Sequence, residues 1–282
     1  MNIAVIGLGL IGGSMALELK HKGFSKHIIG VDNSESHKDQ ALKLKIVDET
    51  CSIEEAIKES QLIILSTPVN VSSKIILSIL NIIDDQILMD VGSTKYELIK
   101  KIKSHPKRKN FVATHPIAGT EFSGPSAAHL GLFKDKVNII CDQKDSSPKA
   151  LNTIKEIYDL LEMKTIFMTA QDHDVHSAYV SHISHISSFS LALSVMDKEK
   201  DEKNILNMAG SGFESTVRLA KSSPEMWAPI LELNKENIID SLDEYIMNLN
   251  SFKNLLQNDK FGELKTQMTK TNYIKNILKG IK

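Results

Sequence analysis

Short apolar runs alternate with stretches of helical spacing through the first 170 residues. Buried strands are expected at residues 3–6, 27–31, 62–65, 86–91, 111–113, 137–141 and 165–168. Helices are expected at residues 10–22, 71–82, 96–103 and 148–161, with another that begins at a Ser52-Ile-Glu-Glu55 capping box and ends near Ser60. This alternation is typical of a doubly wound sheet. We predict a Rossmann-like, mostly parallel α/β domain over residues 1–170.

The rest of the chain, residues 171–282, has helical spacing throughout. Helices are expected from Thr169 or Asp172 to residue 197, and then at residues 203–208, 214–221, 227–256 and 260–281. The first of these is apolar or small on nearly every face, which is typical of a helix buried on all sides. Because a small domain most often buries such a helix against another subunit, we predict an all-α dimerisation domain and a homodimer formed through it.

Three glycines interrupt the chain directly after the first predicted strand. They form a Gly-x-Gly-x-x-Gly turn that leads into a helix, the fingerprint of dinucleotide binding. Gly7 permits the tight turn, Gly9 lets a pyrophosphate approach the backbone, and Gly12 lets the helix pack against the strand. Unpaired N–H groups at the start of the helix then face the phosphates. The predicted cofactor contacts in this turn are Gly7, Leu8, Gly9, Leu10, Ile11 and Gly12.

An acidic residue, Asp32, ends the second predicted strand about 20 residues after Gly12. Its carboxylate accepts hydrogen bonds from the ribose hydroxyls of NAD but repels the 2′-phosphate of NADP. We therefore predict NAD as the cofactor, although the nearby Lys38 leaves use of both cofactors open.

The composition argues against several other classes of protein. The chain has 41% hydrophobic and 24% charged residues, as in an ordinary soluble globular protein, and its formal net charge of −1 is unsuited to binding nucleic acid. The apolar stretch at residues 3–17 is too short to span a membrane, and no basic residues precede it as in a secretory signal. Cys51 and Cys141 are too few for a disulfide framework, so we expect free thiols and a cytoplasmic protein.

Polar residues and helix breakers follow five of the predicted strands. Gly7, Asp32, Thr67 with Pro68, Ser93 and His115 each lie at or just beyond a strand's carboxyl end. Because open α/β sheets bind ligands at this edge, we expect these five segments to meet at one crevice.

His115 and Ser93 are the candidate catalytic residues. A neutral histidine beside Pro116 has no evident cap or core role and is a natural general base; the alternative is a loop histidine bonded to backbone. Ser93 would orient that imidazole or a substrate hydroxyl, or would serve as N-cap of the helix at residues 96–103.

Two further groups of polar residues allow more than one interpretation. His173, His176, His182 and His185, with Asp172 and Asp174, could hold a metal, but acids at a helix start also favour its dipole, so we predict no metal. Arg218 either extends from a helix surface into solvent or binds a carboxylate.

Several motifs together resemble the prephenate dehydrogenase family, also called TyrA, over nearly the whole chain. The residues that carry the resemblance are 7–13, Asp90-Val-Gly-Ser-Thr-Lys95, His115-Pro-Ile-Ala-Gly-Thr-Glu121 with Ser123-Gly124, Ser181-His-Ile-Ser-His185, Gly212-Phe213, Arg218-Leu-Ala-Lys-Ser and Pro224-Glu-Met-Trp227. The resemblance implies a nucleotide-binding domain followed by a dimerising helical domain. It also implies NAD-dependent oxidative decarboxylation of prephenate to 4-hydroxyphenylpyruvate in tyrosine biosynthesis.

The resemblance also implies roles for individual residues. His115 would take the proton of the ring hydroxyl while Ser93 positions substrate and cofactor. His185 and Arg218 would bind the carboxylate or pyruvyl groups of the substrate, and Glu121 would line or gate the entrance. The motif neighbours Thr120, Ser181 and His182 complete the predicted substrate site. We expect no fused ACT or chorismate mutase domain, so feedback by tyrosine would act at the active site.

One departure from the family pattern leaves the substrate open. A basic residue and an aspartate usually follow the phenylalanine, where this chain has Glu214 and Ser215, so arogenate is an alternative to prephenate. Two further functions compete with this family. One is a reductase of similar layout, such as a β-hydroxyacid dehydrogenase or a pyrroline-carboxylate reductase, and the second is a nucleotide-sensing protein without catalysis.

Overall fold

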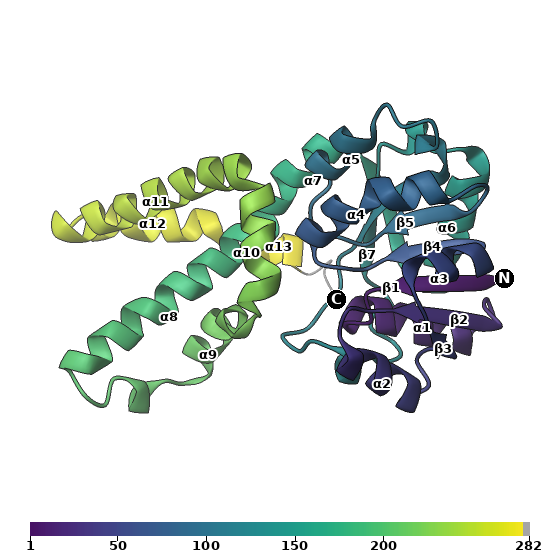
Figure 1. The fold of residues 1–282 in the computed structure, drawn as a ribbon. Helices are drawn as coiled ribbons and strands as arrows, with labels where there is room; N and C mark the ends of the chain where they lie inside the picture. Colours follow the sequence, from purple (N-terminus) through teal and green to yellow (C-terminus); the bar gives the residue numbers. More distant parts are fainter. Residues whose placement is uncertain (279–282) are drawn as a thin grey trace.

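The computed structural model describes residues 1–278 and contains a sheet domain from which helices project (Figure 1). The sheet has eight strands, and every strand predicted from the apolar runs is present. The strands are β1 (Asn2–Ile6), β2 (His27–Val31), β3 (Glu49–Thr50), β4 (Leu62–Leu65), β5 (Ile87–Asp90), β6 (Phe111–Pro116), β7 (Val137–Cys141) and β8 (Lys164–Met168). The edge strand β3 was not predicted, because two residues are too few to give a periodic pattern.

The sheet is doubly wound, as predicted. Its strand order is β3-β2-β1-β4-β5-β6-β7-β8, so the chain leaves β1 toward one edge and returns to the other side of β1 with β4. Strands β1 to β6 are mutually parallel, whereas β7 pairs antiparallel with β6, and β8 is parallel to β7. The carboxyl ends of β1, β2, β4, β5 and β6 therefore lie at one edge of the sheet.

Helices cover both faces of the sheet and bury one apolar cluster on each. The clusters form because the strands are apolar on both faces and successive side chains point to opposite faces. One face packs against α1 and α6, and the other packs against α3, α4 and α5. The predicted Ser52–Glu55 capping box is present at the start of α3. The helices of this domain are α1 (Leu10–His21), α2 (Glu35–Lys43), α3 (Ile53–Glu59), α4 (Val69–Ile82), α5 (Tyr96–Ile102) and α6 (Pro148–Leu160), with short 3₁₀ turns η1 (Arg108–Asn110), η2 (Pro125–Ala127) and η3 (Gln143–Asp145).

The second part of the chain is helical and extends from the sheet domain in two arms, one formed by α8 and α9 and the other by α11 and α12 (Figure 1). It contains α7 (Ala170–Ser177), a π-helical turn η4 (Ala178–His182), α8 (Ile183–Asp201), α9 (Ser211–Val217), α10 (Pro224–Leu233), α11 (Lys235–Gln257), α12 (Phe261–Thr271) and α13 (Ile274–Leu278), with 3₁₀ turns η5 (Leu206–Met208) and η6 (Arg218–Lys221). The predicted α/β fold followed by helices is confirmed.

Several predicted helices are interrupted. The helix expected to end at residue 197 contains the π-helical turn η4, and the one expected at residues 227–256 breaks at Asn234. Residues 203–208 form only the turn η5, and 214–221 divide between α9 and η6. The last helix divides into α12 and α13, and its expected end at residue 281 lies outside the described residues. Apolar spacing does not reveal such breaks because both flanking segments keep the same period.

Helix α8 is not buried on all sides within one chain. Ser188 is its one fully buried residue, and Leu193 and Met196 are 59% and 55% exposed. Apolar residues are also exposed on α11, including Ile246, Met247 and Leu249. The arms thus present apolar surface that no other described part of this chain covers.

Among residues 1–278, no helix combines the length and the apolar character that a membrane crossing requires.

Candidate active site

The five segments expected to meet do lie at one edge of the sheet. Gly7 follows β1, Asp32 follows β2, Thr67 comes shortly after β4 and Ser93 after β5. His115 is the penultimate residue of β6. Because these strands are parallel, the sheet brings together residues that are far apart in the sequence.

Two of the three glycines of the first turn are required by the fold, and one is not. Gly7 has φ +97°, and a Cβ there would lie 2.4 Å from the carbonyl oxygen of Ser66. A Cβ at Gly12 would lie 2.2 Å from the carbonyl oxygen of Gly7. A Cβ at Gly9 would meet nothing within 4 Å, so its absence leaves open space beside the first turn of α1. This is the arrangement that a dinucleotide pyrophosphate requires.

The amides around this turn divide into two groups. The backbone N–H of Leu8 donates to Asp32 Oδ2 at 2.9 Å, and the Leu8 side chain is fully buried. Leu8 therefore fixes the Asp32 carboxylate, while the N–H groups of Leu10, Ile11 and Gly12 belong to the first helical turn, which has no intrahelical acceptors. Asp32 Oδ1 also accepts the amide of Ser34 at 2.9 Å.

Thr67 and Pro68 shape the neighbouring turn. The hydroxyls of Thr67 and Ser72 share a hydrogen bond of 2.8 Å, and Pro68 is the N-cap of α4. Since the helix starts at Val69 rather than at residue 71 as expected, this turn is tighter than the sequence suggested.

His115 is hydrogen-bonded to a second histidine. Its Nδ1 lies 2.8 Å from Nε2 of His173, and Nδ1 of His173 lies 2.7 Å from Oδ1 of Asp174. His173 is fully buried and Asp174 nearly so, whereas His115 is half-buried. Burial above all, and then neighbouring positive charge, lowers the pKa of His115 well below its usual value. His115 is therefore a neutral base at physiological pH.

Asp174 also holds the start of α5. Its Oδ1 and Oδ2 accept the amides of Lys95 and Tyr96, each at 2.9 Å, so it satisfies two donors at the helix terminus. The Lys95 ammonium is fully buried and pairs with the buried carboxylate of Asp90. Helix α7 and the loop after β5 are thereby joined beside His115.

Ser93 lies in this loop and is half-buried. The N-cap of α5 is Lys95, so the interpretation of Ser93 as a helix cap was wrong. The Ser93 hydroxyl has no hydrogen-bond partner within residues 1–278, and neither has Nε2 of His115. Both polar groups are thus available to a ligand.

The helical side of the site contains three rings in contact, one of which is the indole of Trp227. His185 stacks on Trp227 with ring centroids 3.5 Å apart, and His182 meets the same indole edge-on at 5.9 Å. Nδ1 of His185 donates to the carbonyl oxygen of Ser181 at 3.0 Å. Trp227 packs against Val69 at the start of α4, so it joins the helical part to the sheet domain.

His182 is held by an asparagine at the break between α10 and α11. Asn234 Nδ2 donates to the carbonyl oxygen of Asp174 at 2.7 Å and contacts Nδ1 of His182 at 3.1 Å. Burial, chiefly, lowers the pKa of His182 to about 4. His182 is therefore neutral near pH 7.

The loop after β6 carries Thr120 and Glu121. Thr120 is exposed and its hydroxyl accepts the amide of Phe122 at 3.2 Å. Glu121 Oε2 lies 3.7 Å from a guanidinium nitrogen of Arg218, which is 52% exposed. This contact bridges the two parts of the chain. Arg218 is both exposed and close to a carboxylate, so both interpretations of it stay open.

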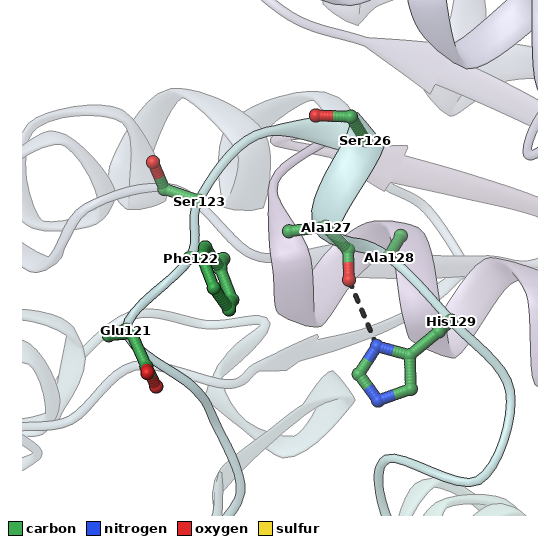
Figure 2. Close-up of a pocket in the computed structure, with 7 residues that line it drawn as sticks. All are labelled: Glu121, Phe122, Ser123, Ser126, Ala127, Ala128 and His129. Carbon is green, nitrogen blue, oxygen red and sulfur yellow. Dashed lines mark hydrogen bonds between the residues drawn. The ribbon is translucent and has the colours of Figure 1, made fainter.

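The same loop lines an open surface cavity of about 600 Å³. Figure 2 shows the loop arching around it, with Glu121 and Phe122 on one side and His129 on the other. The amide of His129 donates to Ser14 of α1 at 3.0 Å, so the cavity adjoins the helix that follows the glycine turn. The lining residues are Glu121, Phe122, Ser123, Ser126, Ala127, Ala128 and His129.

Sequence reasoning assigned no role to several residues of this site. His173 and Asp174 were weighed only as metal ligands or as residues of a helix start, yet they bind each other, His115 and α5. Of the two predicted caps of this helix, Thr169 is the one used: its hydroxyl accepts the amide of Asp172 at 3.0 Å. Within residues 1–278, no group of three or more His, Cys, Asp or Glu side chains is arranged to hold a metal ion. Lys95 belonged to the Asp90–Lys95 motif but was given no role, because its burial and its pairing with Asp90 appear only in the structure.

The chain is similar to known proteins along nearly its whole length. Residues 15–167 match a family model described as the nucleotide-binding domain of prephenate dehydrogenase, and residues 169–270 match one described as its dimerization domain. A prephenate dehydrogenase of Bacillus subtilis is 32% identical over 262 residues, which cover 92% of this chain and 71% of that protein. A cyclohexadienyl dehydrogenase of Zymomonas mobilis is 30% identical and covers 89% of this chain and 87% of its own.

A solved structure has nearly the same fold. The prephenate dehydrogenase from A. aeolicus in complex with hydroxyphenyl propionate and NAD+ gives a TM-score of 0.91 at 28% identity, over 99% of this chain and 98% of that one.

Proposed function

Because this chain belongs to the prephenate dehydrogenase family, we propose that it oxidises prephenate with NAD+, releasing carbon dioxide and forming 4-hydroxyphenylpyruvate. The observation that carries the proposal is the imidazole of His115, whose Nε2 has no partner within residues 1–278 and lies at the sheet edge that also carries the dinucleotide turn. The resemblance inferred from the motifs agrees with the comparisons.

The residues at the glycine turn fit NAD. The space beside Gly9 would accept the pyrophosphate, and the first-turn amides of α1 would bind it. The Asp32 carboxylate, fixed by the amides of Leu8 and Ser34, would accept hydrogen bonds from the ribose hydroxyls. Because it would repel the 2′-phosphate of NADP, it favours NAD. When bound, NAD+ supplies the hydride acceptor.

His115 and Ser93 would handle the reacting hydroxyl group. As the C–H bond at the ring carbon gives up its hydride, Nε2 of His115 takes the hydroxyl proton and the C–O bond becomes a carbonyl. The bond to the ring carboxylate then breaks, carbon dioxide leaves, and the electron pair enters the ring, which becomes aromatic. The former carbonyl oxygen recovers a proton as the phenol forms. The chain therefore mainly positions the reactants and moves one proton.

The substrate side chain would bind on the helical side of the site. His185 and Arg218 would bind its carboxylate or pyruvyl groups, with Ser181, His182 and Thr120 nearby. Glu121, which contacts Arg218 in the structure, would give up this exposed ion pair when a substrate carboxylate takes its place.

Arogenate is the second candidate substrate. Glu214 and Ser215 stand where the family usually has a basic residue and an aspartate, and both are exposed on α9. Arogenate carries an ammonium group where prephenate carries a keto group, so a carboxylate at position 214 would favour it. A relative named cyclohexadienyl dehydrogenase adds support.

We also propose that two copies associate through the helical arms. The exposed apolar side chains of α8 and α11 support this, as does the match to a dimerization domain. A cytoplasmic location is consistent with the two free thiols, Cys51 and Cys141.

Formation of NADH tests the proposed function. Purified protein is given prephenate, arogenate or a simple 3-hydroxyacid, each with NAD+ and with NADP+. We expect NADH with prephenate, and the ratio of kcat/KM for the two ring substrates ranks them. Activity only with 3-hydroxyacids would indicate a β-hydroxyacid dehydrogenase, and no turnover despite binding of NAD would indicate a sensing protein.

A further inference from the structure

Two buried side chains lie in line behind the candidate base. His115 is on β6, and His173 and Asp174 are consecutive residues of α7, from the other part of the chain. The two links are 2.8 Å from His115 to His173 and 2.7 Å from His173 to Asp174. Both lengths are those of good hydrogen bonds.

The hydrogen-bond partners fix where each proton lies. Both oxygens of Asp174 accept backbone amides, as an ionised carboxylate would, so Nδ1 of His173 must be the donor to it. Burial lowers the pKa of His173, which is therefore neutral, with a lone pair on Nε2. That lone pair accepts Nδ1–H of His115. The remaining nitrogen of a neutral His115, Nε2, then carries no hydrogen and can accept one.

We propose that His173 and Asp174 are positioning residues that hold His115 in its Nδ1–H form and stabilise the imidazolium that it becomes when Nε2 takes the substrate proton. This inference rests on the proposed function for the identity of the proton donor. In the step, the O–H bond of the substrate breaks and an N–H bond forms at Nε2. His173 and Asp174 keep their protonation states, as the aspartate does behind the histidine of a serine protease.

The charges around His115 make such support necessary. Burial above all disfavours a positive charge on His115, and any positive charge on His173, Lys95 or His182 lowers its pKa further, so His173 supports the charge only as a neutral hydrogen-bond acceptor. Lys95 is paired with Asp90, so Asp174 is the carboxylate that reaches His115 through a hydrogen-bonded ring. Without it, a protonated His115 would be a poorly solvated charge with no carboxylate in its hydrogen-bond chain.

Asp174 is itself held on three sides. The amides of Lys95 and Tyr96 bind its carboxylate, and Asn234 binds its backbone carbonyl. These contacts connect the loop of Ser93, α7 and the break between α10 and α11. A carboxylate held in this way fixes the orientation of the His173 imidazole. The hydrogen bond from His115 to His173 then limits the rotation of the His115 ring.

Nitrogen NMR on the parent protein tests the proton positions directly. In ¹⁵N-histidine-labelled protein at neutral pH, with signals identified by comparison with His115→Asn, we expect His115 to be protonated at Nδ1 and bare at Nε2. A His115 protonated at Nε2 would overturn the proposal. This measurement needs no variant of His173 to fold.

A matched pair of variants tests the contribution to turnover. In His173→Gln the amide oxygen can still accept Nδ1–H of His115 and the amide nitrogen can still donate to Asp174, whereas His173→Leu removes both. We expect kcat of the leucine variant to fall by about 10², within the usual contribution of an oriented general base, and the glutamine variant to keep most of the parent activity. Equal activity of parent and leucine variant, or equal losses in both variants, would overturn the proposal.

The pH profile separates positioning from a general structural role. In His173→Leu the imidazolium of His115 loses its stabilising acceptor, so its pKa falls further and the acid limb of kcat/KM moves to lower pH. A purely structural defect lowers the plateau without moving that limb. If the parent forms no NADH with either ring substrate, the proposed function fails; an active parent whose acid limb does not move in the leucine variant refutes the positioning role alone.

Discussion

The burial of His182 predicts a specific dependence of stability on pH. Its side chain is 1% exposed, and its pKa in the folded chain is about 4 against 6.5 for a free histidine, chiefly because burial disfavours the charged ring. The unfolded chain therefore binds a proton at this residue between pH 6.5 and pH 4, and the folded chain does not. Stability from this residue is fully present above pH 6.5 and is lost progressively as the pH falls toward 4.

The size of the effect follows from these two pKa values. Between pH 7 and pH 5 the linkage relation gives a loss of about 2 kcal/mol in the free energy of unfolding from this one histidine. The variant His182→Asn removes the titrating ring. Its Oδ1 occupies nearly the position of Nδ1, so it can still accept the hydrogen bond from Asn234.

Urea unfolding at pH 7 and pH 5, at one fixed protein concentration, measures the change. We expect the parent to lose about 2 kcal/mol more than His182→Asn between the two pH values, because the other buried histidines contribute equally to both proteins and cancel. His129→Asn, at an exposed histidine, is the matched control: it removes an imidazole that is not buried and should keep the pH dependence of the parent. Equal pH dependence in the parent and His182→Asn would refute the assignment of a buried neutral ring.

Three further predictions concern the cofactor turn and the substrate site. Gly9→Ala should keep the thermal midpoint of the parent but bind NAD more than about tenfold more weakly, as measured by calorimetry. Gly12→Ala should unfold at a clearly lower temperature, because its Cβ would lie 2.2 Å from the carbonyl oxygen of Gly7. His115→Asn should bind NAD normally while kcat falls by about 10² to 10⁴, and parent-like turnover would remove it as the base. Arg218→Ala should raise KM with little change in stability, because its exposed ion pair contributes about 0–1 kcal/mol; an unchanged KM would exclude a carboxylate contact.

The sheet edge was predictable because its signals are local. Each of Gly7, Asp32 and His115 follows or ends an apolar run, and the parallel order of the strands then brings them together. The glycine turn and the Ser52–Glu55 cap are likewise set by residues a few positions apart.

The support behind His115 was not predictable because its contacts are long-range. Asp174 looks like an ordinary acid near a helix start, yet its carboxylate completes α5, 78 positions earlier at Tyr96. The break at Asn234 is similar: nothing in the spacing marks it, and its purpose appears only when the side chain reaches Asp174 and His182. Buried polar residues of this kind are explained by partners that sequence spacing does not identify.

The stacking of Trp227 on His185 gives this protein its own optical probe. The chain has one tryptophan, so all indole emission comes from a ring 3.5 Å from the imidazole expected to meet the substrate. Protonation of that imidazole, or its displacement by a ligand, will alter the quantum yield without any introduced dye. Stopped-flow spectroscopy on the unlabelled protein can therefore time the arrival of substrate separately from hydride transfer.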